Sequence, residues 1–221
     1  MTGTVHALLL AGGVPPYVDP WHPFAETSDR LGELAEGLGW SVERADDVGA
    51  RLAQGLDGID VLLVNAPAPE GGTDPATAAA ADEALAAFLA RAGGAFALHI
   101  GSTALLGLPR WNALTGARWI PDVSGHPPLG ECVVHGHDDP RVPGDLELFD
   151  ERYTDLALEG DRTVLVSYEG DDGRTHPLVW AREVDGARVL VDTFGHDGRS
   201  FDSATHRELL ERSLRLSLIH I

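Results

Sequence analysis

The sequence predicts a single α/β domain, residues 1–221, in which helices cover both faces of a mostly parallel sheet. Three nearly unbroken apolar runs, Val5–Leu10, Ile59–Val64 and Ala95–Ile100, lack the polar alternation of a half-exposed strand. Such runs are typical of parallel strands that are buried on both faces. Because helical patterns separate them, residues 1–100 alternate between strand and helix, which favours right-handed crossovers and a three-layer α/β/α arrangement.

The other elements follow from helical spacing, β alternation and turn residues. Gly93-Gly94 ends an Ala-rich helix, because glycine adopts the left-handed cap without steric cost. Asp185-Gly186 is a hairpin signal between the last two strands. The predicted helices are Leu31–Leu38, Val48–Leu56, Pro75–Arg91, Thr103–Leu108 and Phe201–Leu218. The remaining predicted strands are Trp40–Arg44, Leu129–His135, Thr163–Tyr168, Leu178–Arg182 and Arg188–Phe194.

The composition excludes several classes of partner and chemistry. A net charge of −19 with no basic face argues against nucleic acid, and no run of eighteen apolar residues could span a membrane. The only cysteine, Cys132, rules out an intrachain disulfide and fits the cytoplasm. All sixteen basic residues are arginine, so Schiff-base chemistry, enzyme-anchored pyridoxal phosphate and a phosphate-binding P-loop are excluded.

The first candidate site residue is His99, at the end of a predicted buried strand. In doubly wound sheets, ligands bind outside the carboxyl ends of the strands. The strand-to-helix turn at His99, with Gly101 close behind, resembles the nucleophile elbow of class I glutamine amidotransferases, which holds a cysteine there. Cys132 lies in a different predicted strand, and imidazole cannot form a glutaminyl thioester. We therefore expect a protein that has an amidotransferase-like fold but is not a glutamine amidotransferase. The alternative interpretation of His99 is a packed core histidine.

Three further histidines lie where the same edge of the sheet would place them. His196 follows Gly195 at the exit of the last strand, although an exposed loop histidine is the alternative. His22 lies in the Pro-rich loop after the first strand, and His126 precedes the fifth strand. The histidines assigned to surface or packing roles are His6, His176, His206 and His220.

One short segment and one tryptophan complete the candidate site. Asp150–Tyr153 offers a carboxylate in Glu151 and a phenol in Tyr153, or else forms an exposed turn. Trp180 could stack on a sugar face or fill the core. We expect these groups and the histidines to line one common pocket.

An ordered set of motifs covers nearly the whole chain. The set comprises His22, Gly93-Gly94-x-x-x-Leu98-His99, Trp119, His126-Pro127, His137-x-x-Pro140, Asp150–Tyr153, Pro177-x-x-Trp180, Gly186-x-Arg188-Val189 and Gly195-His196. This succession resembles the ThuA-like trehalose-utilisation family. The resemblance implies a flavodoxin-like, amidotransferase-related fold and a role in sugar catabolism, in which disaccharides are oxidised to keto-sugars and cleaved. The family's adjacent His-Pro is here His137-Asp138-Asp139-Pro140, which leaves the substrate open.

The leading hypothesis is an enzyme that cleaves a disaccharide or keto-sugar derivative by hydrolysis or lyase chemistry. His99 and His196 would act as acid and base, with Glu151 assisting and His126 lining the cleft. Converging imidazoles would also accommodate a divalent metal with an open coordination position. The alternative is a non-catalytic sugar-binding or regulatory domain, and a homo-oligomer is left open. The residues predicted to bind substrate are His22, Tyr153 and Trp180.

Overall fold

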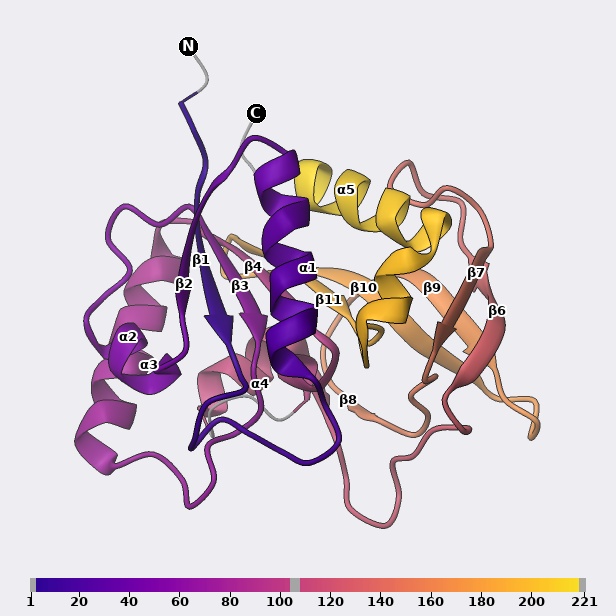
Figure 1. The fold of residues 1–221 in the computed structure, drawn as a ribbon, viewed down its shortest axis with the longest axis horizontal. Coiled ribbons are helices and arrows are strands. Elements are labelled where there is room, and N and C mark those ends of the chain that lie inside the picture. Colours follow the sequence, from indigo (N-terminus) through magenta and orange to yellow (C-terminus); the bar gives the residue numbers. More distant parts are fainter. Residues whose placement is uncertain (1–2, 104–107, 219–221) are drawn as a thin grey trace.

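A mixed sheet forms the centre of the computed structural model, which describes residues 3–103 and 108–218 (Figure 1). Its strands in chain order are β1 (His6–Ala11), β2 (Ser41–Ala45), β3 (Val61–Asn65), β4 (Gly94–Leu98), β6 (Gly130–Gly136), β7 (Leu146–Asp150), β9 (Thr163–Glu169), β10 (Thr175–Val184) and β11 (Ala187–Asp192). Among the described residues they form one sheet in the order β2-β1-β3-β4-β11-β10-β9-β6-β7. A separate short ribbon pairs β5 (Ala117–Arg118) with β8 (Ala157–Leu158).

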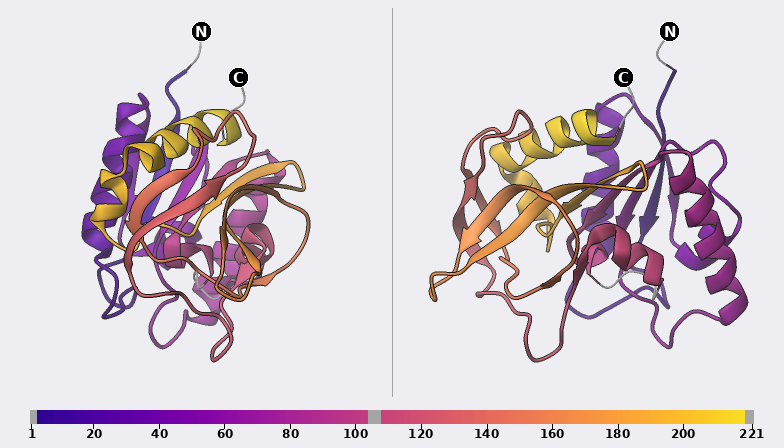
Figure 2. Two further views of the ribbon diagram at one scale, coloured as in Figure 1. Left: turned by 90° about the vertical axis from the view of Figure 1, so that its right-hand side faces the viewer. Right: turned by 180° about the vertical axis from the view of Figure 1, so that it is seen from behind.

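Helices cover both faces of this sheet. They are α1 (Phe24–Gly37), α2 (Val48–Ala53), α3 (Pro75–Ala90), α4 (Pro109–Thr115) and α5 (Ala204–Leu218), with short 3₁₀ turns η1 (His99–Ser102) and η3 (Gly198–Asp202). The helices α1 and α5 lie on one face, and α2, α3 and α4 on the other (Figures 1 and 2). The predicted three-layer α/β/α fold is therefore confirmed. Among the described residues, no helix has the length and hydrophobicity needed to cross a bilayer.

The parallel half of the sheet follows from the apolar runs. β1 pairs in parallel with β2 and β3, and β4 pairs in parallel with β3 and β11. Successive residues of β1 enter opposite cores, Leu8 and Leu10 on the α2–α3 side and Leu9 on the α1 side. Burial on both faces explains why these strands carry no polar alternation. The predicted adjacency of the three runs is confirmed.

The second half of the sheet is antiparallel. β10 and β11 form the predicted hairpin, in which Asp185 and Gly186 have φ of 53° and 86°. β9, β6 and β7 extend the sheet beyond this hairpin, each antiparallel to its neighbour. Strand β7 was not predicted, because its acidic residues and short length give the pattern of a turn. It pairs antiparallel with β6, and Leu146 and Leu148 are buried on one of its faces.

Several predicted boundaries need correction near the candidate site. The strand predicted over Ala95–Ile100 ends at Leu98, because His99 turns into η1 with a φ of 48°. Most of the helix predicted over Thr103–Leu108 lies outside the described residues, and α4 follows it. The last helix begins at Ala204. These shifts place His99 directly on the turn that leaves β4.

Candidate functional site

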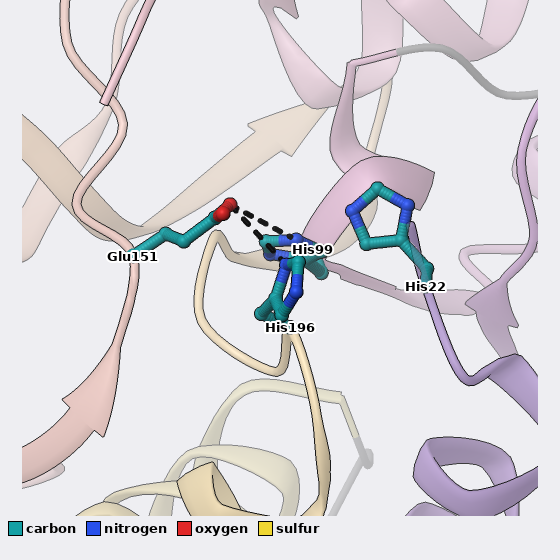
Figure 3. Close-up of side chains that lie close together, drawn as sticks. All are labelled: His22, His99, Glu151 and His196. Carbon is teal, nitrogen blue, oxygen red and sulfur yellow. Dashed lines mark ion pairs between the residues drawn. The ribbon is translucent and has the colours of Figure 1, made fainter. Parts of the chain in front are cut away.

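The sheet topology brings four side chains from distant parts of the sequence to one place. β4 and β11 are parallel neighbours, so their carboxyl ends lie side by side, and His99 and His196 follow these ends. The loop after β1 contributes His22, and the chain leaving β7 contributes Glu151. Figure 3 shows the four side chains turned toward one another. We refer to His22, His99, Glu151 and His196 as the His–Glu cluster.

Glu151 lies at the centre of the contacts. One ligand atom from each member of the His–Glu cluster lies within 4.8 Å of the others. Glu151 Oε2 is 3.3 Å from His196 Nδ1 and 3.7 Å from His99 Nε2. Its Oε1 is 3.4 Å from Nδ1 of His126, which is one-third exposed at the edge of the cluster. Five of the seven predicted site residues therefore lie together here.

The backbone conformation and hydrogen bonds of His99 orient its ring so that Nε2 faces the cluster as an acceptor. Its left-handed φ is unusual for a residue other than glycine, and Gly101 permits the turn because a Cβ there would lie 2.8 Å from Val64 O. His99 Nδ1 lies 2.7 Å from Thr193 O, so Nδ1–H donates to that carbonyl. Its Nε2 accepts from the Tyr153 hydroxyl at 3.1 Å.

The two partners in this contact are both neutral. Burial lowers the pKa of His99 well below its usual value, and the neighbouring His22 lowers it further. Burial also raises the pKa of Tyr153 well above its usual range, with Glu151 adding to the effect. The phenol therefore keeps its proton at neutral pH and remains a donor to the His99 imidazole. Tyr153, a predicted substrate residue, is a direct neighbour of the cluster.

Asp19 orients His22 in the same way. His22 Nδ1 lies 2.8 and 2.7 Å from the two Asp19 carboxylate oxygens, so its Nδ1–H donates outward and Nε2 is left as the acceptor. Burial lowers the pKa of His22, although the hydrogen bond to Asp19 opposes this. A carboxylate that holds the far nitrogen of a histidine is the arrangement that commonly orients metal ligands.

Asp150 positions the other two members of the cluster, Glu151 and His196, through hydrogen bonds to the backbone. This fully buried carboxylate accepts hydrogen bonds from the backbone N–H groups of Glu151 (2.7 Å), Gly195 (2.7 Å) and His196 (3.4 Å). Burial raises the pKa of Asp150 to about 6. The Glu151 carboxylate in turn raises the pKa of His196. Asp150 thus positions both members of the His196–Glu151 ion pair, a role that sequence patterns did not reveal.

The donor set fits a divalent transition metal. Three imidazoles and one carboxylate are ligands that zinc takes in proteins. The buried Nδ1 of His196 has no hydrogen-bond partner among the described residues, although the Glu151 carboxylate is close. Tetrahedral ligands bonded at about 2.0–2.1 Å lie roughly 3.4 Å apart, so the cluster would need to contract slightly. The residues present are therefore suited to hold such an ion.

Aromatic side chains border the cluster. Trp119 packs edge-on against Tyr153 with ring centroids 5.2 Å apart, and its centroid lies 6.2 Å from that of His126. Trp21, next to His22, is 72% exposed. Such faces can stack on the apolar side of a sugar ring. Trp119 was not among the predicted site residues. The sequence feature that could have indicated it is its position next to His126 in the ordered set of motifs.

Trp180 does not border the cluster, contrary to expectation. Its ring is fully buried in the core on the α4 side, and its Nε1–H donates to Thr115 O at 2.9 Å. The core alternative is therefore the one that the structure supports. Cys132 lies in β6, where its thiol donates to Leu148 O, and it is not part of the cluster. His206, assigned to packing, is buried beside Asp192, whereas His220 lies outside the described residues.

Replacing Trp180 with alanine is expected to destabilise the fold by about 3–5 kcal/mol, because it removes a fully buried ring and leaves a cavity. Trp119→Ala removes a partly exposed ring and should lower the free energy of unfolding much less. Denaturant unfolding of the two variants tests this difference. Equal costs for the two substitutions would contradict the assignment of Trp180 to the core.

Comparison with known proteins identifies the family and supports the fold. The model of the ThuA family, described as trehalose utilisation, matches residues 21–216. A ThuA-like protein from Parabacteroides merdae has 16% identity and a TM-score of 0.79, over 97% of this chain and 90% of that one. One from Bacteroides uniformis has 16% identity and a TM-score of 0.69, over 96% and 90%. A GMP synthase component from Thermoplasma acidophilum has 12% identity and a TM-score of 0.58, over 96% and 93%. None of the curated proteins is detectably similar in sequence.

Proposed function

Because the chain belongs to the ThuA, or trehalose-utilisation, family, we propose that it is an enzyme that cleaves a disaccharide or a keto-sugar derived from one. The observation that carries the proposal is the convergence of three imidazoles and one carboxylate within 4.8 Å. A set of acid, base and metal-binding groups this close, from four segments of the chain, is more than packing requires. The reaction would be a hydrolysis or an elimination in the reducing cytoplasm, where the free thiol of Cys132 is stable.

The protonation states suggest which group does what. His196 has a raised pKa and a carboxylate partner, so it is suited to donate a proton to a leaving oxygen. Glu151, which lies between three imidazoles, would stabilise the positive charge of protonated His196 or accept a proton from water. The Nε2 atom of neutral His99 faces the cluster and would accept a proton or coordinate a metal ion. The hydrogen bond from the Tyr153 hydroxyl would orient this imidazole. His126 at the edge would contact the substrate.

A divalent metal fits the same four residues. His22, His99, Glu151 and His196 would hold it, since the Nδ1–H of His22 already donates to Asp19 and that of His99 to Thr193 O. When bound, such an ion would polarise a sugar oxygen or lower the pKa of a bound water. Without a metal, Glu151 and His196 would be the residues that move protons, whereas with one they would serve as its ligands.

A screen of disaccharides and their keto forms tests the proposal. The purified protein is assayed as isolated, after chelation and after reloading with zinc, manganese or magnesium, and its metal content is measured. We expect turnover of a keto-disaccharide, with glutamine left intact. Ammonia release from glutamine would contradict the loss of amidotransferase chemistry. Tight sugar binding without turnover under all conditions would favour the non-catalytic alternative.

A further inference from the structure

Two buried carboxylates hold the loop that carries His196. The N–H group of Phe194 donates to Asp192 Oδ1 at 2.8 Å. The next two N–H groups along the chain, those of Gly195 and His196, donate to the Asp150 carboxylate at 2.7 and 3.4 Å. Both carboxylates are fully buried. Three successive peptide groups of the loop are therefore fixed from inside the protein.

The same loop also fixes a second member of the His–Glu cluster. Thr193 is the first residue of the loop, and its carbonyl oxygen accepts the hydrogen bond from His99 Nδ1–H at 2.7 Å. Its own N–H group donates to Leu178 O at 3.0 Å, which ties this end of the loop to β10. The conformation of residues 193–196 therefore decides where both His99 and His196 point.

His206 is a partner that these two carboxylates share. Its Nε2 lies 2.8 Å from Asp192 Oδ2, and its Nδ1 lies 3.0 Å from Ser200 O. Both ring nitrogens thus face acceptors, as in a protonated imidazole. Burial raises the pKa of Asp150, and the effects that oppose this rise include a hydrogen bond from the Ser200 hydroxyl and the charge of His206. One buried cation therefore stabilises the charge of both carboxylates.

This arrangement is more than a stable core needs. Burying charged groups is costly, and apolar side chains of similar volume would often stabilise a core equally well. A catalytic or metal-binding site, in contrast, needs its side chains held to within about 0.5 Å, which supporting hydrogen bonds achieve. We propose that His206 is a positioning residue of the His–Glu cluster. It acts through Asp192 and Asp150, whose hydrogen bonds hold the loop and with it two imidazoles of the cluster. This role rests on the function proposed above for the cluster.

Hydrogen exchange of the amides of residues 194–196 tests this role without a substrate or a metal. In His206→Gln these amides should exchange at least about tenfold faster than in Phe88→Ala, because the two carboxylates lose their shared cation and hold the loop less tightly. Phe88→Ala is the control with a similar expected loss of stability. It removes a fully buried ring beside Gly93, which precedes β4 and lies far along the strand from the cluster.

Calorimetric titration with zinc connects the loop to the cluster. If wild type binds zinc, His206→Gln should bind it about 10–100-fold more weakly, the usual effect of removing a residue that supports metal ligands, whereas Phe88→Ala should bind it like wild type. A wild-type protein that binds no zinc would contradict the metal site, and amide exchange alone would then decide the role of His206. This role is overturned if residues 194–196 exchange alike in the two variants, or if His206→Gln binds zinc as tightly as a zinc-binding wild type does.

A milder pair of variants keeps the test decisive should His206→Gln not fold. Ser200→Ala removes the hydroxyl that lies 3.1 Å from His206 Nδ1 and donates to Asp150, while the charge of His206 stays in place. Ser213→Ala removes a similarly buried hydroxyl that has no hydrogen-bond partner among the described residues. We expect faster exchange at residues 194–196 in Ser200→Ala than in Ser213→Ala, and equal exchange in this pair would contradict the positioning role.

Discussion

Replacing Glu151 with glutamine is expected to reduce turnover by about 10²–10⁴-fold, the usual contribution of general acid–base catalysis. Glu151 is the one carboxylate of the His–Glu cluster, and it contacts His99, His126 and His196. Glutamine keeps the shape of the side chain but cannot accept a proton or balance an imidazolium. Steady-state kinetics on the substrate found by the screen measures the loss.

The pH profile gives a second test of the same variant. Glu151 raises the pKa of His196, so removing its charge should lower that pKa and move the alkaline limb of the profile to lower pH. Metal affinity, measured by titration, should fall as well. The matched control is Glu159→Gln, which neutralises an exposed carboxylate paired with Arg118. Turnover near the wild-type level in Glu151→Gln would contradict the proposed role.

The parallel half of the fold and most of the site could be predicted because both depend on local patterns and one topological rule. Apolar runs without alternation mark buried parallel strands, and the carboxyl ends of such strands meet at one edge. His99 and His196 therefore had to come close once β4 and β11 belonged to the same parallel set. His22 followed for the same reason, since it leaves β1 toward that edge.

The rest depended on tertiary packing that no local pattern records. β7 is short and rich in acidic residues, so its end at Asp150 resembled an exposed turn, yet Asp150 is buried and binds three backbone N–H groups. Trp119 and Trp180 are chemically alike, and only the position of α4 decides that Trp180 is covered.

A buried ion pair behind the loop that carries His196 should dominate stability in the second half of the chain. His206 Nε2 lies 2.8 Å from Asp192 Oδ2, and both side chains are fully buried. Nδ1 of His206 lies 3.0 Å from Ser200 O, so both ring nitrogens are occupied. Asp192 also accepts from Phe194 N–H at the start of the same loop. Removing one partner of a buried pair leaves an uncompensated charge, which typically costs about 3–5 kcal/mol.

His206→Gln is accordingly expected to lower the free energy of unfolding by about 3–5 kcal/mol near pH 6. The cost should shrink at alkaline pH, and the sign follows from the pKa of His206. Burial lowers this pKa, but Asp192, together with the Ser200 carbonyl and Asp150, raises it overall. A histidine with a raised folded pKa stabilises the fold fully below its unfolded value of about 6.5, and loses that contribution as pH rises through the folded value.

Urea unfolding of wild type and His206→Gln at about pH 6 and pH 9 measures both quantities. His135→Gln is the matched control, since the pair between His135 and Asp145 is exposed and should be worth at most about 1 kcal/mol. A cost for His206→Gln that is the same at both pH values would show that the pair is uncharged in the folded protein. If His206→Gln lowered the free energy of unfolding no more than His135→Gln does, neither the charge nor the burial of the His206–Asp192 pair would contribute to stability. The expected result is a large cost near pH 6 that falls, without vanishing, at pH 9, because neutral His206 still bonds to Asp192.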